Sequence, residues 1–225
     1  METYIRNYEN VISDEICSDI INIYERLWKE KTEEIQSMSL CYDTKGNKTC
    51  GACNCQRLDI MQHKEFQQYT NIILQYLQST IRRYTEDTKI IKHQWPPRYG
   101  FEHFRVKRYL PDGIQQHDLH SDVNDKSSAK RFLSIICYLN EDFSGGETTF
   151  PNFNHNSKVT TGGIIMFPCT WSYLHKGNPV KSGSGKYVLG TFLNYLTTQQ
   201  LNRIGDKTLG TENVWYWKEV YICRK

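Results

Sequence analysis

The chain has 225 residues, of which 38% are hydrophobic and 13% aromatic, so it forms one folded domain or two small ones and is neither disordered nor collagen-like. The 28 Lys and Arg residues against 25 Asp and Glu leave a net charge of +3, too small to indicate a nucleic-acid or membrane partner through charge alone. No apolar run is long enough for a membrane span, and the charged amino terminus does not fit a signal peptide, so we expect a cytoplasmic protein.

The first part of the chain is predicted to be helical. Apolar residues recur at three- and four-residue spacing over residues 16–28, after a capping residue at Ser13 or Asp14. A second helical period covers residues 66–84. We expect residues 1–98 to form a helical support region that packs with the rest of the chain as one domain.

A Cys-rich excursion, residues 41–55, separates these two helices. It contains Cys41, Cys50, Cys53 and Cys55 and shows no regular period. The spacing from Cys50 to Cys53 is used by zinc sites and by redox pairs. In a reducing compartment free thiols are the first expectation, and a zinc site or a disulfide are the alternatives.

Strand patterns dominate after residue 98. Residues rich in β-formers, separated by turns that contain Gly or Pro, occur at 101–109, 132–139, 147–150, 163–167, 187–195 and 214–223. Short strands in this arrangement are typical of an antiparallel sandwich or barrel. We expect residues 99–197 to form this core and residues 198–225 to add a C-terminal strand extension.

Two histidines and two aspartates are crowded together just before the second of these strand segments. His120 and Asp122 are two residues apart, a spacing that places both side chains on one side of a strand, where they can hold one ion. His117 and Asp118 lack this spacing, and we expect them to support the site or to face solvent. His175, in a later strand region, supplies a third ligand. Two imidazoles and one carboxylate leave coordination positions open, which suits non-haem Fe(II) and oxygen chemistry better than structural zinc.

Lys186 lies eleven residues after His175, at the start of an apolar strand. A cation that faces into a barrel is costly unless an anion meets it. A dicarboxylate cosubstrate that chelates the metal with one end and reaches Lys186 with the other would supply that anion. The alternative is a solvated lysine at a strand edge. Arg131, at the start of another strand, is expected to be a surface charge.

Over residues 99–195 the chain resembles the Fe(II)- and 2-oxoglutarate-dependent dioxygenases of the prolyl 4-hydroxylase type. The motifs that carry the resemblance are, in chain order, Arg108-Tyr109, His120-Ser121-Asp122, Tyr138-Leu139-Asn140, Gly145-Gly146-Glu147-Thr148, Phe150-Pro151, Gly162-Gly163, His175 and Lys186. One departure is that Lys186 follows His175 by eleven positions, where the family has nine or ten.

The resemblance implies a fold and a site. The fold is α+β, a double-stranded β-helix (jelly-roll) with supporting N-terminal helices. The implied iron ligands are His120, Asp122 and His175, and Lys186 is the implied partner of the distal carboxylate of 2-oxoglutarate. Tyr109 and Tyr138 are the implied hydroxyl donors to this cosubstrate, and Tyr138 could equally be an aromatic residue of the core.

The implied activity is that of a dioxygenase that hydroxylates an aliphatic C–H bond, with a peptidyl proline as the favoured acceptor. Its cofactor is Fe(II), its cosubstrates are 2-oxoglutarate and O2, its coproducts are succinate and CO2, and ascorbate is the expected reductant. One alternative is the same chemistry on a free amino acid or another small molecule. A second is a non-catalytic, metal-binding jelly-roll module whose helical part meets a partner. A nucleic-acid demethylase finds no support in the near-neutral charge.

Overall fold

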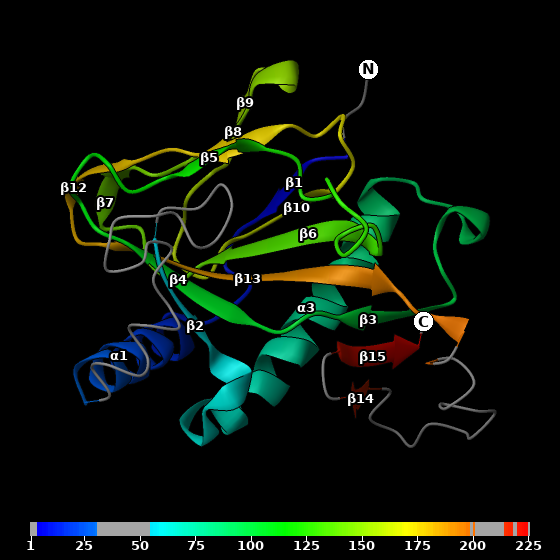
Figure 1. The fold of residues 1–225 in the computed structure, drawn as a ribbon, viewed down its shortest axis with the longest axis horizontal. Helices are drawn as coiled ribbons and strands as arrows, with labels where there is room; N and C mark the ends of the chain where they lie inside the picture. The colour runs from blue at the N-terminus through cyan, green and yellow to red at the C-terminus, as the bar shows by residue number, and fades with distance from the viewer. Residues whose placement is uncertain (1–3, 31–54, 199, 201–213, 218–219, 225) are drawn as a thin grey trace.

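The computed structural model describes residues 4–30, 55–198, 200, 214–217 and 220–224. Within these ranges the chain forms three layers, namely a small β-sheet, a large β-sheet and a layer of helices (Figure 1). The two sheets face each other as a double-stranded β-helix, and the helices cover the outer face of the large sheet (Figure 1). The α+β jelly-roll fold expected from the sequence is therefore confirmed.

The large sheet is built around one long central strand, β13. It contains β1 (Arg6–Tyr8), β2 (Gln56–Asp59), β3 (Arg98–Phe101), β4 (Arg105–Tyr109), β6 (Arg131–Tyr138), β10 (Ile164–Pro168), β13 (Lys186–Tyr195), β14 (Val214–Trp217) and β15 (Val220–Arg224). On one side β13 pairs with β6, and on the other side it pairs with β4 along its first half and with β3 along its second half. The strand segment predicted over 101–109 is therefore two strands, because residues 102–104 leave the ladder between them.

The small sheet consists of four short strands in the order β5-β11-β8-β9. Their bounds are β5 (His117–His120), β8 (Thr148–Phe150), β9 (His155–Asn156) and β11 (His175–Gly177), and a separate pair is formed by β7 (Phe143–Gly145) and β12 (Val180–Gly183). In the antiparallel register of β5 and β11, His120 lies directly opposite His175. Two histidines that are 55 residues apart in the sequence thus become neighbours.

Two long helices, α1 (Asp14–Glu30) and α3 (Gln67–Asp87), lie where the sequence predicted them. The predicted cap is present, since the Ile16 amide donates to Ser13 Oγ at 3.4 Å. Short 3-10 helices occur at η1 (Ile60–Gln62), η2 (Lys64–Phe66), η3 (Lys92–Gln94) and η4 (Pro151–Phe153). None of the helices in the described ranges combines the length and the apolar sequence needed to cross a bilayer.

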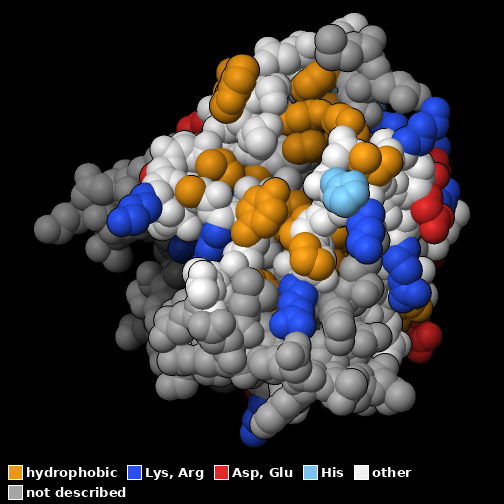
Figure 2. All heavy atoms as spheres, turned by 90° about the vertical axis from the view of Figure 1, so that its right-hand side faces the viewer, with side chains coloured by type: hydrophobic (Ala, Val, Ile, Leu, Met, Phe, Trp, Pro, Cys, Tyr) orange, Lys and Arg blue, Asp and Glu red, His pale blue; other side chains and the backbone are white. Residues whose placement is uncertain are grey.

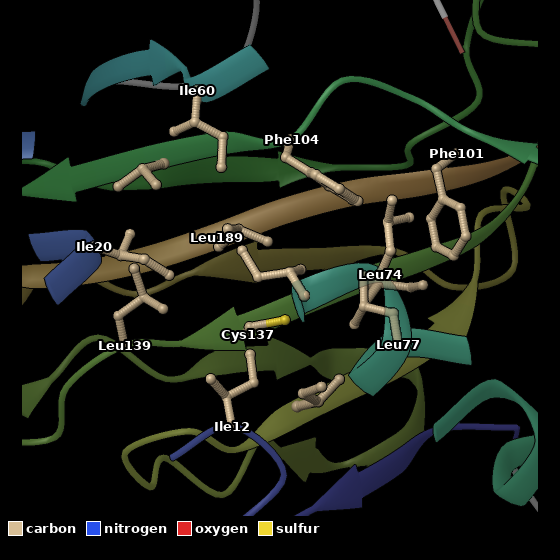
Figure 3. Close-up of a cluster of buried hydrophobic side chains, with 14 of the residues drawn as sticks. Ile12, Ile20, Ile60, Leu74, Leu77, Phe101, Phe104, Cys137, Leu139 and Leu189 are labelled. Atoms are coloured by element: carbon tan, nitrogen blue, oxygen red, sulfur yellow. The ribbon is translucent and has the colours of Figure 1, made fainter. Parts of the chain in front are cut away.

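The main hydrophobic core lies between the large sheet and the helices (Figure 3). Cys137 from β6 and Leu189 from β13 pack in the same cluster as Leu74 and Leu77 from α3. Each fully buried side chain of this kind contributes about 1.5–3 kcal/mol relative to an exposed one. The opposite face of the same strands is thereby left to line the space between the two sheets.

The N-terminal part of the chain also contributes strands to the large sheet, because β1 pairs with β10 and β2 pairs with β4. The domain limits at residues 98 and 197 stay predictions. Cys41, Cys50 and Cys53 lie outside the described residues, whereas Cys55 is buried.

On the face of the molecule shown in Figure 2, hydrophobic side chains gather near the centre, with Lys and Arg side chains around them.

Candidate metal centre

Three potential metal ligands converge between the two sheets. Atoms of His120, Asp122 and His175 that could bind a metal all lie within 4.8 Å of one another. Asp122 Oδ1 lies 3.4 Å from the Nε2 atom of His120 and 3.7 Å from that of His175. His120 ends β5, His175 begins β11 opposite it, and Asp122 follows β5 after one intervening residue. The structure thus brings together the three residues that the sequence analysis singled out.

Backbone carbonyls orient both imidazole rings. His120 Nδ1 lies 2.7 Å from the Asp118 carbonyl oxygen, and His175 Nδ1 lies 3.0 Å from that of Tyr173. A ring whose Nδ1–H donates to a carbonyl keeps its lone pair on Nε2, the atom that here faces Asp122. This is the tautomer that a metal-binding histidine requires.

The electrostatics of the cluster also favour a cation. Burial alone would raise the pKa of the Asp122 carboxyl, but contact with His120 and the charge of His175 bring that pKa below its ordinary value. Burial lowers the pKa of His175, and the charge of the neighbouring Asp122 carboxylate partly opposes this shift. Asp122 Oδ2 is buried and has no hydrogen-bond partner among the described residues. An ionised carboxylate oxygen left in this way costs free energy that a bound cation would offset.

The neighbouring pair does not join the three ligands. The His117 ring stacks on the His120 ring with centroids 3.9 Å apart, and burial together with Lys107 holds its pKa well below the usual range. The Asp118 carboxylate accepts a hydrogen bond from the Gln116 side chain at 3.1 Å. The prediction that these residues support the site therefore agrees with their positions beside His120.

Lys186 lies in a small cavity next to the three ligands. This cavity has a volume of about 40 Å³, and His117, His175, Tyr109, Tyr138 and Lys186 all contribute to its lining. The Lys186 side chain is 3% exposed, and its Nζ donates to the Gly146 carbonyl at 2.9 Å and lies 4.1 Å from the centre of the Tyr109 ring. Lys186 is therefore a buried cation and not a solvated edge lysine.

Tyr138 is held by two other hydroxyl groups. Its hydroxyl oxygen lies 2.9 Å from Thr148 Oγ1 and 2.7 Å from Ser157 Oγ. Burial raises the pKa of the Tyr138 phenol, so its hydroxyl stays protonated. Nothing in the sequence pattern indicated Thr148 or Ser157 as partners of Tyr138, because they come beside β6 only in the tertiary structure.

A larger cavity of about 300 Å³ is lined by all three ligands and shares Lys107, His117 and His175 with the small one. Besides the three ligands, its lining includes four cationic side chains, Arg57, Arg105, Lys107 and Arg131. The expectation that Arg131 is a plain surface charge is wrong. Its Nε and Nη2 donate to the two carboxylate oxygens of Glu102 at 2.8 and 2.9 Å, and Nη1 donates to the Asp122 carbonyl at 3.2 Å. Arg131 thereby fixes the backbone of one ligand.

Comparisons with known sequences agree with this geometry. A family model described as the 2OG-Fe(II) oxygenase superfamily matches residues 104–194, which include the three ligands and Lys186. A curated protein of Acanthamoeba polyphaga mimivirus, named "Putative prolyl 4-hydroxylase", is 36% identical over 98 residues. This match covers 36% of the chain and 40% of the viral protein, so less than half of that relative is represented.

Solved prolyl hydroxylases share the fold. The viral collagen prolyl hydroxylase of Paramecium bursaria Chlorella virus-1, in its 2-oxoglutarate complex, gives a TM-score of 0.60 at 24% identity, over 86% of this chain and 97% of that one. The Trichoplax adhaerens prolyl hydroxylase, in complex with a hypoxia inducible factor peptide, gives a TM-score of 0.61 at 12% identity, over 92% and 88%. A Pseudomonas putida prolyl-4-hydroxylase gives 0.57 at 15% identity, over 87% and 94%.

Proposed function

We propose that this chain, whose residues 104–194 match the model of the 2OG-Fe(II) oxygenase superfamily, hydroxylates an aliphatic carbon of a peptide, with a prolyl residue as the favoured acceptor. The observation that carries this proposal is the convergence of His120, Asp122 and His175 beside a cavity that contains the buried cation Lys186. A metal-binding module without turnover needs the three ligands but has no use for that cation.

The three side chains fit Fe(II). They offer two imidazole nitrogens and an ionised carboxylate, the combination used by non-haem iron oxygenases, and they leave further positions open. The buried Asp122 Oδ2, with no partner among the described residues, is the atom that such an ion would satisfy. When bound, iron with 2-oxoglutarate would supply the oxidising chemistry that places one oxygen atom of O2 in a C–H bond and yields succinate and CO2.

The protein would position the cosubstrate through the small cavity. We assign the distal carboxylate of 2-oxoglutarate to Lys186, whose ammonium group is held by the Gly146 carbonyl and the face of the Tyr109 ring. Tyr138 can donate to the cosubstrate while both contacts persist, because the Thr148 and Ser157 hydroxyls can each be the donor to the phenol oxygen. The same contacts hold the wall of the cavity, and the low exposure of this wall keeps water away from the reacting groups.

A peptide acceptor is supported by the larger cavity and by the relatives. The cavity of about 300 Å³ is lined by all three ligands, whereas Lys186 lines the small cavity, so an acceptor can reach the ligands while the small cavity is filled. Two proteins of similar structure are described as a collagen prolyl hydroxylase and as a prolyl hydroxylase in complex with a hypoxia inducible factor peptide. Both descriptions thus connect a prolyl hydroxylase of this fold with a polypeptide.

An anaerobic titration tests the site. The metal-free protein would receive Fe(II) and then 2-oxoglutarate, while the visible charge-transfer band of the bidentate chelate is followed. We expect the band in the wild type, its loss in Asp122→Ala, and its retention in Asp14→Asn, a change at an exposed aspartate in the first turn of α1. Fe(II) binding without the band would favour the non-catalytic module.

A second assay tests the acceptor. Proline peptides would be incubated with Fe(II), 2-oxoglutarate and O2, with succinate and the mass of the peptide as readouts. We expect a gain of one oxygen atom on proline and a matching amount of succinate. Turnover of 2-oxoglutarate with free amino acids and none with peptides would contradict the peptide acceptor and leave the chemistry intact.

A further inference from the structure

The larger cavity has an excess of positive charge. Arg57, Arg105, Lys107 and Arg131 line it, and Asp122, one of the three candidate ligands, is the single acidic residue among the described lining residues. The chain as a whole is close to neutral, with a net charge of +3. The lining of this one cavity therefore has more cationic than acidic side chains.

The pairing of two strands creates this concentration. In the register of β2 with β4, Arg57 lies directly opposite Lys107, so both side chains point to the cavity face. The alternating residues Leu58 and Val106 point the other way, into the core against the helices. Like charges directly opposite each other on a sheet are destabilising, by roughly 0.2–1 kcal/mol. An arrangement that costs stability at a cavity wall is typical of a binding function.

Nearby carboxylates do not neutralise this pair. Glu102 accepts two hydrogen bonds from Arg131, and its Oε2 lies 3.7 Å from Arg105 Nη1. Asp59, which lies opposite Arg105, contacts the His103 ring at 2.5 Å instead. In the part of the chain that the structure describes, no carboxylate comes within ion-pair distance of Arg57 or Lys107.

The cofactors of the proposed reaction do not use this charge either. The two positive charges of Fe(II) and the one of Lys186 balance the three negative charges of Asp122 and of the two carboxylates of 2-oxoglutarate. The loaded site is thus neutral without Arg57 and Lys107. Cations that line a partly enclosed site attract anions. The charges of Arg57 and Lys107 can therefore bind an anionic group of the acceptor.

We propose that the larger cavity selects acidic peptides, in which an Asp or Glu side chain close to the hydroxylated proline binds between Arg57 and Lys107. This inference rests on the proposed function and names its substrate class. Arg57 is the cleaner probe of the two cations, because it lines the larger cavity alone, whereas Lys107 lines both cavities.

Equilibrium binding of matched peptides tests this proposal. Fluorescent proline peptides that carry one Asp, placed in turn at positions on either side of the proline, would be compared with the same peptides carrying Asn. The protein would be loaded with Fe(II) and 2-oxoglutarate without oxygen, and the dissociation constant would be read by anisotropy. We expect at least one Asp peptide to bind about tenfold more tightly than its Asn counterpart, with an advantage that shrinks as salt increases.

Charge reversal supplies the matched variants. Arg57→Glu is expected to abolish the preference for Asp and to favour a Lys peptide, whereas Arg82→Glu, the same change at an exposed position on α3, is expected to leave the preference unchanged. Equal affinities for the Asp and Asn peptides would overturn the proposal, and so would a preference that survives in Arg57→Glu. Tight competition by free aspartate or another small dicarboxylate would also overturn it, in favour of a small anionic acceptor. Absence of the charge-transfer band in the wild type would instead count against the proposed function.

Discussion

The two faces of the large sheet are made by the same strands and have opposite character. On the helix side, Val106, Cys137 and Leu189 are buried in an apolar cluster with α1 and α3. On the cavity side, Lys107 and Lys186 from the same strands are cations. The first face stabilises the fold through apolar burial, whereas the second holds charges that cost stability and that only ligands would balance. Alternation of residues along a strand allows one sheet to do both.

The largest expected effect is a loss of stability when a core side chain on the helix side is truncated. Phe104 is fully buried in the core beside Phe101, with ring centroids 5.9 Å apart (Figure 3). Phe104→Ala should lower the free energy of unfolding by about 3–5 kcal/mol, because it removes a large side chain and leaves a cavity. Urea unfolding measures this loss. The exposed Trp171, changed to Ala as a control, should shift stability by no more than about 0.5 kcal/mol. Equal losses in the two variants would contradict this description of the core.

A change on the cavity side should affect binding more than stability. Lys186→Met keeps the bulk of a buried side chain and removes its charge. We expect the affinity for 2-oxoglutarate to fall about 10- to 100-fold, or about 1.4–2.7 kcal/mol, while the free energy of unfolding stays the same or rises. Titration of the charge-transfer band and urea unfolding give the two numbers. Lys181→Met, at an exposed position of β12, is the matched control. Unchanged affinity in Lys186→Met would assign the carboxylate to another cation.

A third prediction concerns pH and the contact between α1 and β13. The Tyr187 hydroxyl donates to Glu25 Oε1 at 2.7 Å, and burial together with Glu25 raises the pKa of Tyr187 to about 12. Because the folded state prefers the neutral phenol, this stabilisation is complete below pH 10 and is lost as the pH rises through about 12. Partial exposure limits the loss to about 1 kcal/mol.

The variant Tyr187→Phe isolates this contribution. Its free energy of unfolding should fall less steeply than that of the wild type between pH 10 and 12, the interval set by the raised pKa of Tyr187. Chemical unfolding at several alkaline pH values gives both slopes. Parallel slopes would show that the phenol does not titrate differently in the folded and unfolded states.

The smallest expected effect is a gain of stability when one cation is removed from the cavity side of β4. Lys107→Thr removes the like charge opposite Arg57 and places a good β-former in β4. We expect the free energy of unfolding to rise by about 0.2–1 kcal/mol. We expect the same variant to bind an acidic peptide more weakly. Lys176→Thr, an exposed strand position opposite Thr149, should not show this gain. A loss of stability in Lys107→Thr would contradict the repulsion.

The sequence was most informative where the signal is local. The periodicity of residues 16–28 predicted α1, because a helix with one buried stripe requires that spacing. The motifs around His120, Asp122 and His175 identified three residues that the structure brings together. By contrast, the pattern over 101–109 did not reveal the break between β3 and β4. That break depends on β13, which pairs with each of them in turn.

Residue types and their order thus determined the layers, the helices and the identity of the candidate ligands, because these follow from short-range spacing and from motifs. Only the tertiary structure decided that Arg57 faces Lys107, that Arg131 is paired with Glu102, and that Tyr138 is held by Thr148 and Ser157. The physical reason is register. Strands distant in the sequence can pair in several alignments, and a shift of one residue turns every side chain to the opposite face. The apolar face against the helices selects a single alignment, and this choice also fixes which charges line the cavity.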